Sequence, residues 1–424
     1  MLQIQYIREN SEALLESLKR RNLANAEELI QEALTADKAR REEQAKADEK
    51  KAEMNALSKQ IGELFKSGKK EEANEMKAKT SQLKDEIKAL NDAFAAHTNE
   101  LTQVLYQIPN APHPSVPAGN SDTDNIIENE EGSAPNLPAN ALPHWELAKK
   151  YKLIDFELGV KITGAGFPVY LGKGAQLQRA LISYFLSEAS KAGYVEVQPP
   201  LMINEASGLG TGQLPDKEGQ MYHAVEDDLY LIPTAEVPIT NLYRDVILNE
   251  KDLPVKHTGY TPCFRREAGS YGKDVRGLNR LHQFDKVELV QIAKPEDSYA
   301  ILDSMVEHVK GLLRGLGLQF RTLRLCGGDL GFTSALTFDL EVYSAAQDKW
   351  LEVSSVSNFE TFQANRLKCR YRNTEGKTAL AHTLNGSALA LPRILAALLE
   401  NNQTENGIHI PDVLVPFTGF KTIH

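Results

Sequence analysis

The sequence predicts an α+β protein in which a long helical hairpin precedes a larger domain of strands and helices. Two observations support this class. Residues 26–101 contain no proline and only two glycines, and Ala, Glu, Lys and Gln dominate them, which is typical of long helices. Beyond residue 143, segments with the alternation of strands, as around 255–290, follow segments with helical periodicity, as in 172–200.

The hairpin should consist of two antiparallel helices over about residues 26–101, after a short helical start in residues 1–24. Its apolar residues step by three and four, the pattern of a coiled-coil seam: Met54, Leu57, Ile61 and Leu64, then Leu83, Ile87, Leu90 and Phe94. A glycine in the polar segment KSGKK places the turn near Gly68. Taken alone, such an arm is equally typical of a dimerisation coil or a spacer. Its tip carries three lysines, a cluster that more often serves solubility than binding: Lys66, Lys69 and Lys70.

A change of composition separates this arm from the rest of the chain. Residues 111–143 are rich in Pro, Asn, Gly and Ser and include the acidic run DTDNIIENEEG, so we expect a linker or surface loop with a solvated acidic face. The predicted domains are therefore a helical domain over 1–110, this linker, and a second domain over 144–424 that opens on His144 and Trp145 in PHWEL.

Within the second domain, residues 172–200 should contain a long amphipathic helix. In residues 172–200 the apolar face is formed by Leu177, Ala180, Leu181, Tyr184 and Phe185. Gly193 should end the helix, and YVEVQPP should follow as a strand that stops at Pro200.

The segment LYLIPTAEVPIT, at 229–240, places Thr234 and Glu236 on one face of a predicted strand end. A hydroxyl and a carboxylate side by side suit a small amino acid, because the carboxylate can bind its ammonium group. An ordinary exposed strand end is the plainer alternative.

Residues 255–290 predict two strands joined by a long loop. Alternation would gather Arg265 and Glu267 on one face, together with Phe284 and Glu288 from the second strand. A permanently charged planar donor beside an aromatic ring suits a nucleoside triphosphate, with Arg for phosphate and the ring for the base. An exposed hairpin with ordinary charges is the alternative.

The last part of the chain predicts two strands within residues 320–364 and then a strand, a turn and an apolar helix over 382–400. In TFDLEVY, Phe338, Leu340 and Val342 should face the core. Arg393 falls in the opening turn of the final helix, and a helix start with a nearby arginine is a favourable place for phosphate.

The overall composition limits the function classes. At 424 residues and 42% hydrophobic content, the chain can form two or three domains with a sizeable core. The three cysteines are dispersed, so neither disulfides nor a zinc knuckle is expected. This cysteine usage is typical of a protein in a reducing cytoplasm. No apolar run approaches the ~20 residues of a membrane span. The absence of G-x-x-x-x-G-K-[ST] argues against a P-loop enzyme, and no internal repeat is evident.

Several of these segments together resemble a known family. FRRE at 264–267, followed by Arg280 and Phe284 as R-x-x-x-F, resembles the second signature motif of class II aminoacyl-tRNA synthetases. The flanking GLNRLHQFDKVE, the PHWEL, TAE and EVSS segments and the long arm are similar to those of seryl-tRNA synthetases. Residues 172–200 resemble the first motif and residues 382–400 the third.

The resemblance implies a fold and a reaction. The second domain would be a class II synthetase catalytic domain, a mixed and mostly antiparallel sheet flanked by helices, working as a homodimer. It would activate L-serine with ATP and Mg²⁺ and transfer the seryl group to tRNA(Ser), gripping the tRNA with the arm. Whether tRNA(Sec) is also charged stays open. The net charge of −10 argues against wholesale coating of nucleic acid, although it leaves room for a local basic patch, and we expect neither a DNA nor a membrane partner.

The resemblance also assigns roles to residues. Arg265 and Arg393 would be catalytic, holding the α- and γ-phosphates, and Glu352 and Ser355 would carry magnesium. The serine pocket would comprise Thr234, Ala235, Glu236, Glu288, Asn385 and Ser387. The ATP site would comprise Arg265, Arg266, Glu267, Arg280, Phe284, Glu352, Val353, Ser354, Ser355 and Arg393. The tip lysines Lys66, Lys69 and Lys70 would contact tRNA.

At two places the sequence does not follow the family pattern directly. Glu352 and Ser355 are three residues apart and would face opposite sides of a regular strand, so the shared role predicts a bulge or strand end at Ser354 or Ser355. Ala388 and Pro392 stand where the third motif usually has glycine, although proline is compatible with a first helical turn.

Two rival functions have to be weighed. A synthetase-like enzyme that charges a carrier protein would usually lack the arm. An inactive tRNA-binding coiled-coil protein would have no need of Arg265, Glu352 and Arg393 together.

Overall fold

The computed structural model describes residues 1–268 and 276–424. These residues form two compact units. The first contains Met1–Lys19 and Leu23–Pro109, and the second contains Arg20–Asn22 and Asn110–His424. Among the helices described, none combines the length and the apolar character needed to cross a lipid bilayer.

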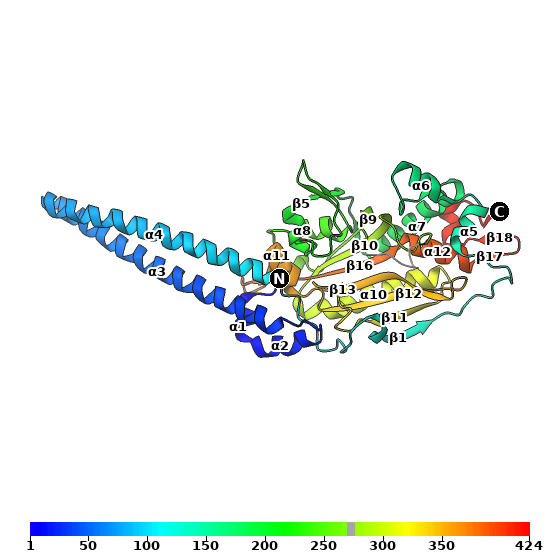
Figure 1. The fold of residues 1–424 in the computed structure, drawn as a ribbon, viewed down its shortest axis with the longest axis horizontal. Coiled ribbons are helices and arrows are strands. Elements are labelled where there is room, and N and C mark those ends of the chain that lie inside the picture. The colour runs from blue at the N-terminus through cyan, green and yellow to red at the C-terminus, as the bar shows by residue number, and fades with distance from the viewer. Residues whose placement is uncertain (269–275) are drawn as a thin grey trace. The chain divides into compact units, whose positions relative to one another are not determined.

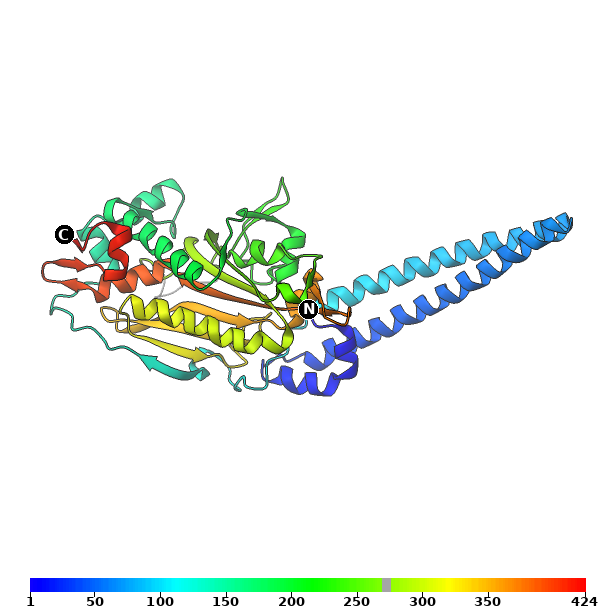
Figure 2. The same ribbon diagram turned by 180° about the vertical axis from the view of Figure 1, so that it is seen from behind.

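The first unit is a helical hairpin with two short helices at its base. Helices α3 (Ala26–Lys66) and α4 (Lys70–Leu105) lie side by side along their length (Figures 1 and 2), which confirms the predicted coiled-coil arm. Gly68 joins them with φ of +77°, a conformation that glycine adopts without strain. Helices α1 (Ile4–Glu9) and α2 (Ser11–Lys19) pack against α3. At ~1.5 Å per residue, α3 is about 60 Å long.

The seam between α3 and α4 narrows away from the base of the hairpin. Ala33 and Ala36 are buried near the base, whereas Met54 and Ile61 are only half-buried farther out. Ion pairs between the two helices supplement the few apolar contacts of this seam. In one of them, Lys50 Nζ lies 3.0 Å from Glu86 Oε2. The outer part of the hairpin is therefore mostly solvated, as its polar composition predicts.

The second unit is built on one eight-stranded sheet. Only the pair β4 and β9 is parallel, and every other pair is antiparallel, so the predicted mixed and mostly antiparallel sheet is confirmed. In spatial order the strands are β1 (Ile126–Glu131), β11 (Phe320–Arg324), β12 (Leu336–Ser344), β13 (Lys349–Asn358), β16 (His382–Ala390), β10 (Gln283–Ala293), β9 (Val255–Phe264) and β4 (Val195–Glu196).

Long helices pack on one face of this sheet, and the other face carries polar groups over part of its area, beside α9 (Glu236–Asn241) and α11 (Thr361–Leu367), which also pack on it. Figure 2 shows α10 lying over the strands, and α7 and α12 pack on neighbouring strands. Leu289 and Ala388 point into this helical core, while their neighbours Glu288 and Ser387 point to the opposite face because side chains alternate along a strand. The helices of the unit are α5 (His144–Lys150), α6 (Phe156–Ile162), α7 (Gly172–Lys191), α8 (Glu205–Thr211), α9 (Glu236–Asn241), α10 (Ser298–Gly315), α11 (Thr361–Leu367), α12 (Leu391–Asn401) and α13 (Val415–Thr418).

Smaller sheets surround the main one. They pair β2 (Ile154–Asp155) with β3 (Val169–Tyr170), β5 (Met202–Asn204) with β7 (Leu229–Leu231) and β6 (His223–Ala224), β8 (Ile247–Asn249) with β14 (Arg370–Arg372) and β15 (Thr378–Leu380), and β17 (Gln403–Thr404) with β18 (Gly407–His409) and β19 (Thr422–Ile423).

Several predicted elements differ in detail. The prediction that residues 111–143 form only a linker or loop is wrong for Ile126–Glu131, which form the edge strand β1. The acidic residues of this strand are not simply solvated, because Glu128 pairs with Arg324 at 2.9 Å and Glu131 with Arg314 at 2.7 Å. Complementary charges on the neighbouring strand and helix therefore stabilise a segment whose composition is typical of loops.

Helix α7 and the strand after it follow the prediction with one change. The five residues expected on the apolar face of 172–200 are all buried, and Gly193 follows the end of α7 with φ of +85°. The strand after it is much shorter than YVEVQPP, since only Val195–Glu196 pair with β9. Residues 320–364 contain three strands, whereas the sequence predicts two. The additional strand is β11.

Candidate active site

The predicted nucleotide residues meet at one end of the main sheet. Antiparallel pairing places the end of β9 beside the start of β10, with Cys263 opposite Phe284. It likewise places the end of β16 there, with Ala390 opposite Lys286. Arg265 follows β9 directly and Arg393 lies in the first turn of α12, which follows β16. Both guanidinium groups therefore belong to the same end of the sheet.

Arg265 and Phe284 form the first contact of the site. The Arg265 guanidinium carbon lies 5.2 Å from the centre of the Phe284 ring, within cation–π range. The Arg265 Nε donates to the Pro233 carbonyl at 3.4 Å, and its backbone N–H donates to His282 at 2.9 Å. These bonds hold the arginine beside the ring that the sequence predicted as its neighbour.

Arg393 joins the same site from the other side. Its NH1 donates to the Glu352 carbonyl at 2.7 Å and lies 3.7 Å from the Glu352 carboxylate. Its Nε donates to the Asn279 carbonyl at 3.2 Å. Pro392 is the second residue of α12, so the substitution of the usual glycine leaves the helix start in place.

A bulge brings Glu352 and Ser355 to one face of β13. Glu352 pairs with Glu341 and Ser355 with Asp339, so the register skips Val353. The bulge lies one residue before the predicted Ser354 or Ser355. Because Asp339 and Glu341 share a face, their partners Glu352 and Ser355 share it too.

These oxygens fit a hard divalent cation. Carboxylate and hydroxyl oxygens are typical ligands of Mg²⁺, which is commonly held by one or two carboxylates together with substrate phosphates. The Oδ1 atom of Asp339 beside Ser355 is buried and has no hydrogen-bond partner among the described residues. Burial raises the pKa of the Asp339 carboxyl well above its usual range, and the nearby Glu352 charge adds to this effect. A cation would relieve that repulsion.

Two buried carboxylates, Glu236 and Glu288, lie close together where the sequence predicts an amino-acid pocket. Asn385 Nδ2 bridges them, at 2.9 Å from Glu236 and 3.1 Å from Glu288. Thr234 donates its hydroxyl hydrogen to Glu288 at 3.1 Å and accepts from the Glu236 backbone N–H at 3.2 Å. Ser387 pairs with Glu288 across the strands, which completes the group.

The environment of Glu236 makes it a receptor for a cation. The side chain accepts only from two neutral amides, Gln363 at 2.6 Å and Asn385, and a carboxylate has about four acceptor positions. Burial raises the pKa of Glu236 to about 7, and the negative charge of Glu288 adds to the shift. An ammonium group would supply the missing positive charge.

The local structure of this pocket corrects one prediction. Thr234 and Glu236 were expected on a strand end, but Glu236 is the first residue of the short helix α9 and Ala235 is its N-cap. The Thr234 hydroxyl accepts from the N–H of Glu236 at the helix start, a typical role for threonine there. The two side chains still face the same group of residues, because Thr234 bonds Glu288, and Asn385 bonds both Glu288 and Glu236.

Other predicted residues take different places. Ser354 donates to the Ser387 carbonyl at 2.6 Å, and Val353 is buried in the core. Both residues therefore support the strands that carry the site. Glu267 and Arg280 pair with each other at 3.0 Å. Arg266 is exposed. Residues 269–275, which fall in the predicted long loop, lie outside the described residues, and the tip lysines are exposed in the first unit.

Sequence reasoning missed three side chains of the site. Gln363 donates to Glu236, and its own Oε1 accepts from Thr383 at 2.7 Å. Lys286 Nζ lies 2.5 Å from Glu288. Lys286 falls on the same face of the predicted strand as Phe284 and Glu288, and this alternation could have identified it as a residue of the site. Gln363 and Asp339 gave none, since a helical glutamine and a strand aspartate are ordinary surface residues in a sequence.

Comparison with known proteins agrees with this geometry. Residues 1–112 match the family model described as Seryl-tRNA synthetase N-terminal domain, and residues 221–402 match tRNA synthetase class II core domain (G, H, P, S and T). The chain is 49% identical to the serine–tRNA ligase of Salinibacter ruber, over 100% of this chain and 99% of that protein. It is 47% identical to that of Akkermansia muciniphila at the same coverage.

Solved structures give the same answer. The seryl-tRNA synthetase of Pyrococcus horikoshii, in a crystal structure complexed with ATP, matches with a TM-score of 0.92 and 33% identity, over 100% of this chain and 99% of that one. The cytoplasmic serine–tRNA ligase of Naegleria fowleri matches with a TM-score of 0.87 and 27% identity. The order of the motifs, the arm, the sheet and these full-length similarities lead to one conclusion: the chain belongs to the seryl-tRNA synthetase family.

Proposed function

We propose that the protein is a serine–tRNA ligase that activates L-serine with ATP and then transfers the seryl group to tRNA(Ser). The observation that carries the proposal is the position of the Glu236 and Glu288 pocket on the sheet face that also carries Arg265 and Phe284. Full-length relatives named serine–tRNA ligase, and a matching structure complexed with ATP, support the same reaction.

The first step needs positioning and charge compensation. In the proposed arrangement the serine ammonium binds Glu236, and the serine carboxylate attacks the α-phosphate beside Arg265. The bond from the α-phosphorus to the bridging oxygen breaks, which yields seryl-adenylate and pyrophosphate. Phe284 stacks on adenine, and Arg393 neutralises the terminal phosphates. Catalysis of this kind comes mainly from preorganised charges.

Magnesium is proposed as the companion of ATP. Glu352 and Ser355 would hold it, and the bound ion would reduce the negative charge of the triphosphate. Among the described residues, no three His, Cys, Asp or Glu side chains converge into a complete metal site, so the triphosphate would supply further oxygen ligands.

The arm is proposed as the tRNA contact, with Lys66, Lys69 and Lys70 at its tip as phosphate partners. All three are exposed, although Lys69 also lies 3.1 Å from Glu72. The division into an arm within residues 1–110, a connecting segment over 111–143 and a catalytic domain over 144–424 is likewise proposed. Charging of tRNA(Sec) is a finer proposal, which an assay with that tRNA decides.

The rivals are less well supported. A ligase for a carrier protein has no use for the α3 and α4 hairpin, which matches a seryl-tRNA synthetase family model. An inactive scaffold has no use for a pocket in which buried carboxylates retain unfilled acceptor positions.

An amino-acid panel in ATP–pyrophosphate exchange tests the proposal. Serine should support exchange, and alanine should not, because the hydroxyl-binding groups of the pocket would be left without a partner. Exchange supported equally by alanine, or none with serine, would contradict the proposed activity. Aminoacylation of a long-variable-arm tRNA then separates a tRNA ligase from a carrier-protein ligase.

A further inference from the structure

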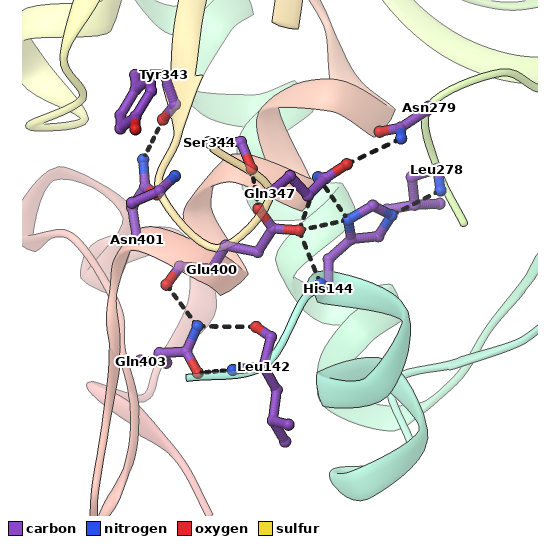
Figure 3. A network of polar contacts seen from close by, with 11 residues as sticks. Leu142, His144, Leu278, Asn279, Tyr343, Ser344, Gln347, Glu400, Asn401 and Gln403 are labelled. Atoms are coloured by element: carbon purple, nitrogen blue, oxygen red, sulfur yellow. Dashed lines mark hydrogen bonds and ion pairs between the residues drawn. The ribbon is translucent and has the colours of Figure 1, made fainter. Parts of the chain in front are cut away.

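A fully buried carboxylate lies at the end of α12 that is distant from Arg393. Glu400 and its neighbour His144 both have side chains that are 0% exposed, and His144 Nδ1 lies 2.7 Å from Glu400 Oε1 (Figure 3). The backbone N–H of His144 and the amide of Gln347 each reach the same carboxylate at 2.8 Å, and the Ser344 hydroxyl bonds its other oxygen. Four donors thus surround this carboxylate, three at Oε1 and one at Oε2.

The carboxylate fixes the direction of every hydrogen bond around it, because it can only accept. His144 must therefore carry its proton on Nδ1, which leaves Nε2 to accept from the Leu278 N–H at 2.8 Å. Gln347 turns its NH₂ group to Glu400, which leaves its oxygen to accept from Asn279 Nδ2 at 3.0 Å. Two relays thus lead from Glu400 to two adjacent residues (Figure 3).

These two residues belong to the wall of the proposed ATP site. The Asn279 carbonyl accepts from Arg393 Nε at 3.2 Å, and the next residue is Arg280. Arg393 and Glu400 are seven residues apart in α12, which is two turns or about 10 Å. One helix therefore holds the segment 278–280 at two points, directly through Arg393 and through the relays from Glu400.

The fit of this segment is close. Gly277 has φ of +68°, and a Cβ atom there would lie 2.2 Å from His144 Nε2. The backbone thus passes directly over the imidazole, and a side chain at 277 would displace either the segment or His144.

We propose that His144, Gln347 and Glu400 are positioning residues that set the place of the Asn279 carbonyl and hence of the Arg393 guanidinium for the triphosphate. The inference rests on the proposed role of Arg393 in ATP binding. The competing explanation is a polar cluster that only stabilises the fold. If the cluster has a positioning role, breaking a relay in a variant that still folds should weaken ATP binding. If the cluster only stabilises the fold, ATP binding by such a variant should not change.

Two glutamines of this cluster make a matched pair for the test. Gln347→Leu breaks the relay to Asn279. Gln403→Leu removes a buried amide that bonds Leu142, at 2.7 and 2.9 Å, and the Glu400 carbonyl, but no residue of 278–280. We expect Gln347→Leu to raise the KM for ATP in pyrophosphate exchange about tenfold, with the KM for serine unchanged. Gln403→Leu should lower the melting temperature and leave the KM for ATP within about twofold.

Further variants keep the proposal falsifiable if Gln347→Leu does not fold. Asn279→Ala removes the other end of the same hydrogen bond and should show the same rise in KM for ATP. Glu400→Gln should retain more ATP affinity than Glu400→Leu, because its amide can turn NH₂ toward the Ser344 hydroxyl, which is able to accept. Lower melting temperatures with an unchanged KM for ATP in Gln347→Leu and Asn279→Ala would overturn the proposal. Absence of serine-dependent exchange in the unaltered protein would instead overturn the proposed function.

Discussion

Single side chains decide the chemistry of the amino-acid pocket. Glu236 lies in a setting without a direct cationic partner, since its two hydrogen bonds come from the amides of Gln363 and Asn385. The nearby charged groups are Glu288, Lys286 and Arg265, and the net effect of burial and Glu288 is a pKa of about 7. A buried carboxyl with such a pKa is half protonated near neutral pH and becomes fully ionised when a cation binds.

This pKa predicts how serine binding depends on pH. The ammonium group of serine binds the ionised carboxylate, and a pKa of about 7 leaves roughly a tenth of the sites ionised at pH 6. The Kd for serine, measured calorimetrically, should therefore be about tenfold weaker at pH 6 than at pH 8. In Glu236→Gln, binding should be weak at both pH values and independent of pH in this range. A Glu236→Gln variant that kept the pH dependence of the unaltered protein would show that another group titrates.

At the level of helices and strands, the elements with strong periodicity were predictable from the sequence. The hairpin turn at Gly68, the buried face of α7 and the start of α12 all follow local rules of composition and spacing. The strand β1 was not predictable, because its acidic residues are stabilised by Arg314 and Arg324, which are distant in sequence. The bulge at Val353 was inferred only from a presumed shared role, and the helix start at Glu236 was mistaken for a strand.

The arm gives the prediction at this level. Replacing residues 44–92 with a short Gly-Ser linker shortens both helices equally and keeps the base, where Asp37 bonds Arg8 at 2.9 Å and Arg40 at 2.8 Å. We expect serine-dependent pyrophosphate exchange within about twofold of the full chain, and loss of tRNA charging by about 100-fold, because many phosphate contacts would be lost. Charging at the full rate would mean that the arm is only structural.

A finer variant tests the tip. Exchanging Lys66, Lys69 and Lys70 for alanine should raise the KM for tRNA. It should also reduce the slope of log KM against log salt concentration by up to about three units. Exchanging the exposed Lys251, Lys368 and Lys377 of the second unit is the matched control and should change neither quantity.

For the molecule as a whole, the sheet explains how residues distant in sequence reach one site. Strands β9, β10, β16 and β13 are neighbours, and antiparallel pairing brings Arg265, Phe284, Arg393 and Glu352 to the same end. Alternation along the predicted strands grouped Arg265 with Phe284, and the resemblance to a family added Glu352 and Arg393 to them. Gln363 and Asp339 became apparent only when the strands and helices were assembled, since their roles depend on contacts across the sheet.

The edge of the second unit supports the proposed homodimer. Among the described residues β4 pairs only with β9, and the apolar side chain of Val195 on this edge strand is 61% exposed. We expect a dimer in sedimentation velocity and a shift toward monomer in Val195→Asp, because a buried charge would oppose association. Ile247→Asp, at an exposed position elsewhere, should remain dimeric. A monomeric unaltered protein at micromolar concentration would contradict the dimer.

The most direct measurement is serine-dependent ATP–pyrophosphate exchange by Arg265→Ala, compared with Arg372→Ala at an exposed position of β14. The proposed site predicts a loss of about 100-fold or more in the first variant, since a charge that stabilises the α-phosphate would be missing, and none in the second. Equal thermal melting of both variants would show that the fold is retained. Exchange by folded Arg265→Ala at the rate of the unaltered protein would contradict the assignment of this sheet surface as the ATP site.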